Sequence, residues 1–421
     1  MNAPVAAPVV AVVEPFSSAA MLAPALRAAG FSPVAVVNQA DDDFAVYHSA
    51  LVVKDWDAVV NHHGDIAATV RRLGALSPTA VIPGIEGPSL DVAQQLADAL
   101  TPGHANVAEL VAARRHKYAM HRALAEAGMP IIRQVCTSDA AEVADWIDRE
   151  GLAGQDLVIK PPNSAGTVGM SFVPGGEGWR ERFEAVVGTR DKLGVQRDEI
   201  LVQEHVTGTE FAIDTVSSGG RHSVTDLLRY RRVRLGRGMA IYDSVEWLPY
   251  DRSRYGELLD YGLAALDAVG LRNWAAHTEI IMTDDGPRLM EINPRLAGAG
   301  NPAVTMIATG ESQVTRIVDV CAGRGPELPE GFTLRQHVMA VFLIAHSTGT
   351  VRNAEILEEA RALPSYHSPV RLVTTGDRVE ATTDILTSMT MGYVILAADD
   401  RAQLDVDREA IRALEKQLVI D

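Results

Sequence analysis

Two glutamates beside neighbouring apolar segments are the residues in this sequence best suited to chemistry. Residues 277–302 read HTEIIMTDDGPRLMEINPRLAGAGNP, which places Glu279 before one short apolar segment and Glu291 after the next. The TDDG stretch between them is typical of a β-hairpin turn, so the two carboxylates are expected side by side. Charges on apolar strands are costly unless a cation lies there, and Mg²⁺ prefers oxygen ligands. The hairpin therefore predicts a Mg²⁺ site.

Two further polar residues, Asn293 and Arg295, follow Glu291 in steps of two. Because side chains alternate between the two faces of a strand, we expect Glu291, Asn293 and Arg295 to project the same way. The predicted face thus combines two acids, an amide and a guanidinium.

The elements that position this hairpin belong to a large chain. A length of 421 residues suggests about three domains. The net charge of −17 argues against a nucleic-acid-binding protein. Cys136 and Cys321 form no disulfide framework, which favours a reducing, cytoplasmic compartment. The apolar run at 9–13 is short and lacks preceding basic residues, so we expect a strand there and neither a signal peptide nor a membrane span.

Residues 1 to about 105 alternate between strand and helix patterns, which predicts a parallel sheet with right-handed crossovers. Ligands of such sheets lie at the carboxyl ends of the strands, near Glu14, Ser17 or Glu86 here. Glu86 fits a simple turn residue equally well. The predicted strands cover 9–13, 33–37, 49–53 and 79–84, and the predicted helices cover 19–29, 66–76 and 90–100.

Two lysines lie in the next part of the chain. The pattern of residues 109–127 predicts one helix with Lys117 in its middle, among other basic residues, as on a solvated face. Lys160 ends the apolar run LVI and precedes a loop of small residues, 164–170. Such a loop donates backbone N–H groups to a phosphate in some proteins and is only a turn in others.

Strand patterns continue over 201–218, which contain an E-x-x-x-G-x-E segment. Five arginines between 229 and 237 fit either a basic edge strand or a lid over an anionic ligand. A helix is expected at 253–269, and another follows Gly310. Glycines and prolines at 323–331 indicate a boundary, after which an α+β pattern ends in a helix at 407–418.

Common phosphate-binding and hydrolase motifs do not match. The sequence has no G-x-x-x-x-G-K-[ST], G-x-S-x-G or H-E-x-x-H. What it has, in order, is a helix lysine, a strand lysine before a small-residue loop, the E-x-x-x-G-x-E segment and the acid hairpin. This order resembles the ATP-grasp superfamily over about residues 110–320. The residues that carry the resemblance are Lys117, Lys160, Glu204, Glu210, Glu279, Glu291, Asn293 and Arg295.

The resemblance implies ATP and two Mg²⁺ ions as cofactors, with Mn²⁺ as an alternative metal. It assigns phosphate binding to Lys117, Lys160 and the loop 164–170, with Ser164, Gly166, Thr167 and Gly169. It assigns adenine binding to the connector with Gln203, Glu204 and Val206, and ribose binding to Glu210. Glu279, Glu291 and Asn293 become the metal ligands, and Arg295 faces the transferred phosphate and the acyl intermediate. Arg295, Glu291 and Lys160 are the implied catalytic residues.

Within the superfamily, EINPRLAGAG and the final domain resemble the L-amino-acid ligases that include bacilysin-type dipeptide synthetases. The implied reaction joins a carboxylate to an amino acid's amine through an acyl phosphate, releasing ADP and phosphate. Gly298 and Gly300 would grip a substrate carboxylate or only permit tight packing. His277 is a pocket residue or a core histidine.

The predicted fold is α/β and α+β in several domains. They are a parallel α/β domain at 1–108, an ATP-grasp domain at 109–325 with a lid subdomain at about 140–207, and an α+β domain at 326–421. We expect small-molecule substrates, no nucleic-acid or membrane partner, and a homodimer at the level of the family. The alternatives are an ATP-grasp carboxylase of biotin-carboxylase or purine-pathway type and a non-catalytic ATP-binding module.

Overall fold

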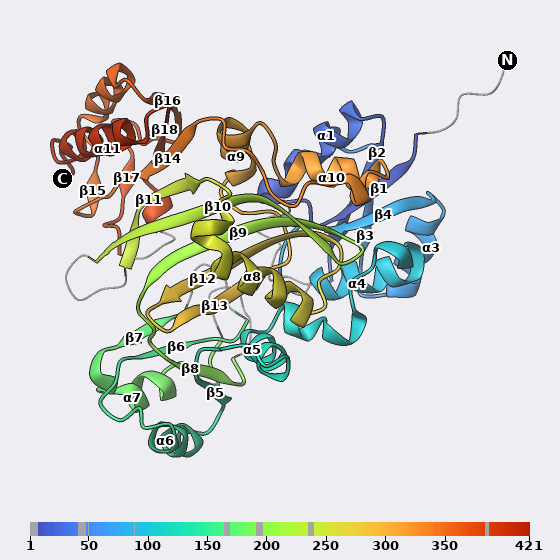
Figure 1. Ribbon diagram of the computed structural model, residues 1–421, viewed down its shortest axis with the longest axis horizontal. Coiled ribbons are helices and arrows are strands. Elements are labelled where there is room, and N and C mark those ends of the chain that lie inside the picture. Colours follow the sequence, from blue (N-terminus) through green and yellow to red (C-terminus); the bar gives the residue numbers. More distant parts are fainter. Residues whose placement is uncertain are drawn as a thin grey trace.

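The chain folds around one eight-stranded sheet, with a parallel sheet and a small antiparallel sheet beside it, as seen in the computed structural model (Figure 1). The structure describes residues 7–40, 48, 50–87, 89–163, 169–190, 197–234, 240–383 and 387–421. Within these residues, every helix is too short or too polar to cross a membrane.

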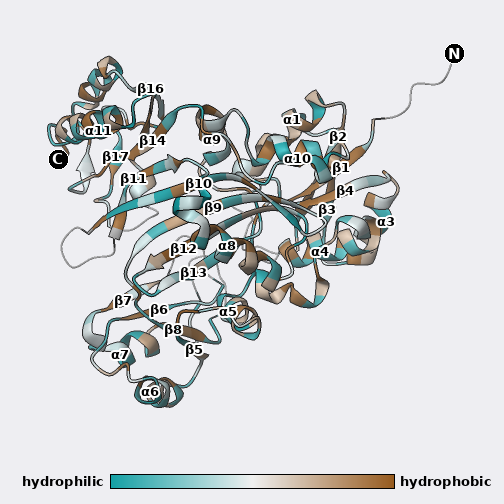
Figure 2. Ribbon diagram, in the orientation of Figure 1, coloured by the Kyte–Doolittle hydropathy of each residue, from teal (hydrophilic) through white to brown (hydrophobic). Residues whose placement is uncertain are grey.

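The N-terminal unit is a four-stranded parallel sheet in the order β3-β2-β1-β4, as predicted. Apolar strand residues are buried on both faces, one against α1 and α10 and the other against α3 and α4. Figure 2 shows α3 and α4 with both hydrophilic and hydrophobic segments, as expected for helices with one face on a sheet. The elements are β1 (Val9–Val13), α1 (Leu22–Ala28), β2 (Ser32–Asn38), β3 (Ala58–His62), α3 (Ile66–Gly74), β4 (Pro78–Pro83) and α4 (Ser89–Leu100).

The strand predicted at 49–53 is wrong. Residue 49 lies outside the described residues, Val53 begins a 3-10 turn (Val53–Asp55), and the third strand is β3. Val52 and Val53 are 48% and 60% exposed, so this apolar run is not buried against the sheet. The AVV stretch of β3 pairs with β2 instead, which shows that burial and pairing, rather than local hydrophobicity, select the strand.

The central sheet has the order β13-β12-β9-β10-β11-β14-β18-β16. Helix α8 (Arg252–Ala268) packs against one face of its first strands in a core with α5. The last three strands lie beyond the predicted boundary at 326, so the sheet runs from the hairpin region into the C-terminal region without interruption. The strands are β9 (Thr209–Ser218), β10 (Arg221–Arg234), β11 (Ala240–Leu248), β12 (Trp274–Thr283), β13 (Gly286–Asn293), β14 (His337–Phe342), β16 (Tyr366–Val370) and β18 (Tyr393–Ala398).

A second small unit is an antiparallel sheet in the order β5-β8-β6-β7, with α6 and α7 beside it (Figure 1). Other helices join the units: α5 precedes the small sheet, α9 and α10 follow the hairpin, and α11 covers the C-terminal strands. The remaining bounds are α5 (Lys117–Glu126), β5 (Gln134–Thr137), α6 (Ala140–Arg149), β6 (Leu157–Lys160), β7 (Ser171–Val173), α7 (Trp179–Glu184), β8 (Ile200–Glu204), α9 (Asn301–Thr309), α10 (Gln313–Cys321), β15 (Gly349–Thr350), β17 (Arg378–Val379) and α11 (Arg401–Glu415).

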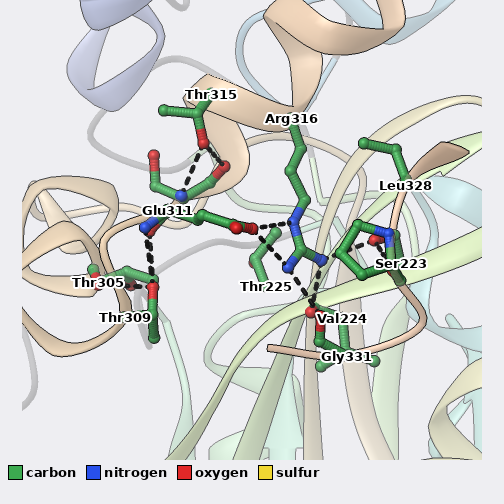
Figure 3. A network of polar contacts seen from close by, with 12 residues as sticks. Ser223, Val224, Thr225, Thr305, Thr309, Glu311, Thr315, Arg316, Leu328 and Gly331 are labelled. Atoms are coloured by element: carbon green, nitrogen blue, oxygen red, sulfur yellow. Dashed lines mark hydrogen bonds and ion pairs between the residues drawn. The ribbon is translucent and has the colours of Figure 1, made fainter. Parts of the chain in front are cut away.

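A buried arginine, Arg316 of α10, fastens the segment that leads into the C-terminal region (Figure 3). Its guanidinium donates to Ser223 Oγ at 2.6 Å, to the Val224 carbonyl at 2.7 Å and to the Gly331 carbonyl at 2.8 Å. Glu311 balances the charge at 2.9 Å. Since the carbonyls of residues 328–331 all accept bonds from the start of β10 or from Arg316, this segment is a strap against the sheet rather than a loose linker.

We expect Arg316→Met to lower the free energy of unfolding by about 3 kcal/mol, because buried carbonyls would lose a charged donor. Arg324→Met is the matched control. Arg324 pairs with Asp319 of α10 on the surface, and this exposed pair should contribute about 0–1 kcal/mol to the free energy of unfolding. Urea unfolding of both variants checks the prediction. Equal losses in the two variants would contradict it.

Candidate active site

The predicted hairpin is confirmed, and its register pairs the two glutamates directly. Glu279 of β12 lies opposite Glu291 of β13, and His277 lies opposite Asn293. Next to this pair the register shifts, because Ile280 pairs with Leu289. Met290 is therefore the extra residue of a β-bulge in β13. Directly opposed residues share a face, so these four side chains lie together.

The extension of β13 to Arg295 is wrong. The strand ends at Asn293, and the Arg295 N–H donates to the Asn293 carbonyl at 2.8 Å across Pro294. A proline has no N–H with which to continue a ladder, so the chain turns here. Arg295 still lies near the cluster, since the charges of Glu291 and Glu279 act on its guanidinium, which pairs with Glu86 of the N-terminal unit.

The neighbouring strands continue the polar face. Asp214 and Glu210 of β9 lie opposite His277 and Ile281 of β12, and Asp226 lies opposite Asp214 on β10. All three acids are buried. The same period of two that identifies Glu291 and Asn293 would have found Asp214, two steps from Glu210 in EFAID.

The single helix predicted at 109–127 is wrong, and so is the mid-helix position of Lys117. Two short 3-10 turns end at Arg114, and α5 begins at Lys117 itself. His116 has an extended backbone and caps α5, since its Nδ1 accepts from the Ala119 N–H. The break turns Lys117 toward the hairpin, where its Nζ lies 2.6 Å from Glu291 Oε2.

Helix α5 runs along β13, the edge strand of the central sheet. Met120 Sδ accepts from the Ile292 N–H at 3.2 Å, which covers a donor that an edge strand leaves open. His121 on the same helix is fully buried and close to Lys160 and Lys117. Burial, and then the charges of Lys160 and Lys117, lower the pKa of His121 to about 3, so the ring stays neutral. No pattern in the sequence indicated that His121 would lie beside both lysines.

Lys160 ends β6 and is buried beside Lys117. Burial, and then the nearby Lys117 charge, lower the pKa of Lys160 to about 8. A buried cation with a lowered pKa is stabilised by an anion, and a phosphate would supply one. The two lysines and the two glutamates therefore come together from three separate segments.

Glu291 is the centre of this charge cluster. Its Oε1 accepts from Asn293 Nδ2 at 2.9 Å, and its Oε2 pairs with Lys117. Burial alone would raise its pKa, but the Lys117 ammonium, together with Asn293 and Lys160, lowers it to about 2. Glu291 is therefore ionised at any physiological pH.

His277 lies between two acids. Its Nδ1 is 2.6 Å from Asp214 Oδ1, and its Nε2 is 3.3 Å from Glu279 Oε1. Although burial opposes the charged form, Asp214 and Glu279 raise the pKa of His277 to about 10. Asp226 has a raised pKa because of its burial and of Asp214. His277 is thus a satisfied, charged histidine that contacts a predicted metal ligand.

The glycine loop after the hairpin meets two other units. The Gly300 N–H donates to Ser18 Oγ at 3.3 Å, and Tyr393 of the C-terminal region donates its hydroxyl to the Ala299 carbonyl at 2.7 Å. Gly300 has a φ of 75° and Ala299 one of 55°, so the loop is held in the left-handed region just before α9. Gly298 lies beside Arg295. Glu14 and Ser17 also have positive φ values, and such strain gathers at functional sites.

The predicted nucleotide-binding residues follow the small sheet. Gln203 and Glu204 end β8, Val206 lies in the connector, and Glu210 begins β9. The Glu204 side chain pairs with Arg133, which leaves only its backbone for a base. Glu210 pairs with Arg232, and burial raises the pKa of Glu210 to about 7. Ser164, Gly166 and Thr167 lie outside the described residues. Gly169 ends their loop with a φ of 74°.

The donor set of the hairpin fits Mg²⁺. Glu279 and Glu291 offer carboxylate oxygens from directly paired positions, and Asn293 adds an amide. These are hard oxygen ligands, without a thiol or a free imidazole among them. In this structure Lys117 forms an ion pair with Glu291. With Mg²⁺ and ATP bound, Glu291 would pair with the metal and Lys117 with the phosphates.

Comparisons with known proteins find similar proteins and a family model that matches the region of the site. A family model described as an ATP-grasp domain matches residues 153–303, which include Lys160 and the hairpin but not Lys117. Dapdiamide A synthase of Enterobacter agglomerans is 27% identical over 97% of this chain and 96% of its own length. L-amino acid ligase from Bacillus licheniformis has a TM-score of 0.72 at 16% identity, over 98% of both chains. N5-Carboxyaminoimidazole synthetase from Staphylococcus aureus, complexed with ADP, has a TM-score of 0.68 at 13% identity, over 96% of both. This chain contains an ATP-grasp domain and, over nearly its whole length, has the fold of an L-amino acid ligase.

Proposed function

We propose that this protein is an ATP-dependent ligase that joins a carboxylate to the amine of an amino acid. The observation that carries the proposal is the partly buried cluster in which Glu279 and Glu291 lie opposite each other while Lys117 and Arg295 reach them from outside the hairpin. Phosphoryl transfer needs positioned charges more than covalent groups, and this cluster supplies them. The match to dapdiamide A synthase extends over 97% of the chain and supports ligation.

The nucleotide would lie between the small sheet and the hairpin. Lys117 and Lys160 neutralise its phosphates, together with the loop that holds Ser164, Gly166, Thr167 and Gly169. The connector from Gln203 to Val206 binds adenine through its backbone. Glu210 accepts from the ribose hydroxyls, and it must then exchange its present partner, Arg232.

Glu279, Glu291 and Asn293 would hold two Mg²⁺ ions, with Mn²⁺ as an alternative. Bound metal supplies charge neutralisation on the transferring phosphate. Arg295, already held by Glu86, contributes a fixed positive charge where the substrate carboxylate attacks. Because the salt bridge with Glu86 already positions the Arg295 guanidinium, this group needs less rearrangement during the reaction.

The reaction would proceed in two stages. A substrate carboxylate oxygen attacks the γ-phosphorus of ATP, and ADP leaves as an acyl phosphate forms. The amine nitrogen then attacks the acyl carbon, phosphate leaves with the bonding electrons, and the nitrogen loses a proton. The N–H groups of the loop at Gly298 and Gly300, close to Ser18 and Tyr393, would bind the carboxylate of the amine substrate. His277 orients Glu279 through the contact of its Nε2 with Glu279 Oε1.

A pairwise screen tests this function. Purified protein is incubated with ATP, Mg²⁺ and pairs of amino acids, ADP release is measured, and products are identified by mass spectrometry. ADP release that depends on two substrates, with an amide product, is the expected result. ATP binding without turnover across the whole panel would favour a non-catalytic module.

A second candidate function is a carboxylase, since N5-carboxyaminoimidazole synthetase shares the fold at nearly the same TM-score. In that reaction bicarbonate, in place of a substrate carboxylate, would attack the γ-phosphate beside the same charged cluster. ADP release that requires bicarbonate and is indifferent to amino acids would favour this candidate over the ligase.

Lys160 gives the proposed site a pH dependence. Its pKa of about 8 means that the ammonium is present below pH 8 and is lost as the pH rises through that value. Because ATP favours the charged form, kcat/KM for ATP is expected to fall on the alkaline side. In Lys160→Arg the guanidinium stays charged, so the alkaline fall near pH 8 should disappear even if the maximum is lower. An unchanged alkaline limb in this variant would contradict the phosphate role of Lys160.

A further inference from the structure

Three side chains outside the proposed active site bring metal-ligating atoms together: His116, Cys136 and Glu199. Their nitrogen, sulfur and oxygen atoms all lie within 4.8 Å of one another. His116 Nε2 is 2.9 Å from Glu199 Oε1. The two side chains are 20% and 47% exposed, so an ion could reach them from solvent.

The cluster spans two parts of the fold. Cys136 lies on β5, the edge strand of the small sheet, and pairs with Leu201 of β8. Glu199 directly precedes β8. His116 lies outside this sheet, at the start of α5. An ion held by all three would tie the small sheet to the helix that bears Lys117.

An imidazole, a thiol and a carboxylate are ligands typical of Zn²⁺ rather than of Mg²⁺. With Zn–N and Zn–O bonds of about 2.0 Å and a Zn–S bond of about 2.3 Å, ligand atoms lie about 3.5 Å apart. Ligand atoms that now lie up to 4.8 Å apart would have to approach one another by at most about 1.3 Å, which rotation of the side chains can supply. In the metal-free form, burial and Glu199 raise the pKa of Cys136 to about 12, so the thiol keeps its proton and shares Glu199 with His116.

We propose that His116, Cys136 and Glu199 form a Zn²⁺ site with a fourth position for water, and that Zn²⁺ bound there weakens ATP binding. On binding, the Cys136 thiol loses its proton to solvent and a Zn–S bond forms. The link to ATP, which rests on the proposed function, is the cap of α5. Since Nδ1 of His116 accepts from the Ala119 N–H at 3.4 Å, Nε2 is the nitrogen that faces Glu199.

Metal binding changes the protonation of that histidine. A neutral imidazole that binds Zn²⁺ through Nε2 carries its proton on Nδ1, so Nδ1 no longer accepts a bond from α5. The first turn of α5 loses its cap, and this turn holds Lys117. A displaced Lys117 would neutralise the nucleotide phosphates less well.

Metal titrations of the full chain test the site without any need for turnover. Excess Mg²⁺ is kept present so that the oxygen-rich hairpin is filled, and Cd²⁺ is used as a probe because its thiolate bond gives an ultraviolet charge-transfer band. We expect one Cd²⁺ per chain with this band, displaced by Zn²⁺. Cys136→Ser and Glu199→Gln should lose the band or weaken binding at least tenfold, and Cys321→Ser, the control for the other cysteine, should keep it.

His116→Asn separates the two roles of His116, because asparagine still caps a helix but is a poor Zn²⁺ ligand. Direct ATP-binding titrations with and without Zn²⁺ should show weaker binding with Zn²⁺ in the wild type and no Zn²⁺ effect in His116→Asn or Cys136→Ser. Failure of the wild type to bind Cd²⁺ through a thiolate, or equal binding in Cys136→Ser, would overturn the site. Zn²⁺ binding with unchanged ATP affinity would overturn its coupling to α5. Neither outcome depends on which substrates are ligated.

Discussion

Replacing Glu291 with glutamine is expected to slow substrate-dependent ADP release by about 10³-fold or more. The variant keeps the size of the side chain but removes the carboxylate charge that would hold the proposed metal ions. Metal ions contribute several kcal/mol to phosphoryl transfer, and about 1.4 kcal/mol corresponds to a tenfold change in rate. Steady-state ADP release at saturating ATP and Mg²⁺ measures the effect.

Stability must be separated from chemistry in this variant. The pKa of Glu291 is lowered to about 2, so its ionised form stabilises the folded state at every pH above its unfolded value, and glutamine loses that contribution. Activity is therefore compared well below the melting temperature, with circular dichroism as a check on folding. Asp284→Asn, at the exposed turn of the same hairpin, is the matched control and should leave the rate unchanged. Turnover within tenfold of the wild type in Glu291→Gln would refute the metal assignment.

Arg295→Ala is expected to lower kcat by about 10²- to 10³-fold while changing KM for ATP by less than about threefold. The reason is the position of its guanidinium, which Glu86 holds beside the hairpin, where we propose that the substrate carboxylate is phosphorylated. The proposed nucleotide-binding residues of the small sheet do not include Arg295. Arg288→Ala is the control, since that arginine donates to two backbone carbonyls at the hairpin turn, its hydrogen bonds within the described part of the chain. A large rise in KM for ATP at constant kcat would place Arg295 on the nucleotide instead.

The loss of Arg295 also leaves Glu86 without its partner, and the Arg295 charge lowers the pKa of Glu86 in the folded state. The double variant Arg295→Ala/Glu86→Gln removes this buried charge. We expect its kcat to stay as low as that of Arg295→Ala. Recovery of turnover in the double variant would show that Arg295 only neutralises Glu86.

Much of the local structure around the site was predictable because it depends on short-range patterns. The alternation in the hairpin and its TDDG turn determined that Glu279 and Glu291 would pair, and the same period of two places Asn293 with them. The alternation of strands and helices determined the parallel N-terminal sheet. The order of lysines, acids and small residues was enough to recognise an ATP-grasp domain.

Only the tertiary structure decided which charges meet. Lys117 reaches Glu291 because the chain breaks before α5, and Glu86 reaches Arg295 because the N-terminal sheet packs beside the hairpin. These contacts join residues far apart in the sequence, and no local periodicity encodes them. The continuation of the central sheet into β14 has the same cause, since strand pairing over long distances depends on burial of whole faces. The sequence by itself therefore determined which of the predicted ligands share a face, and packing determined their partners.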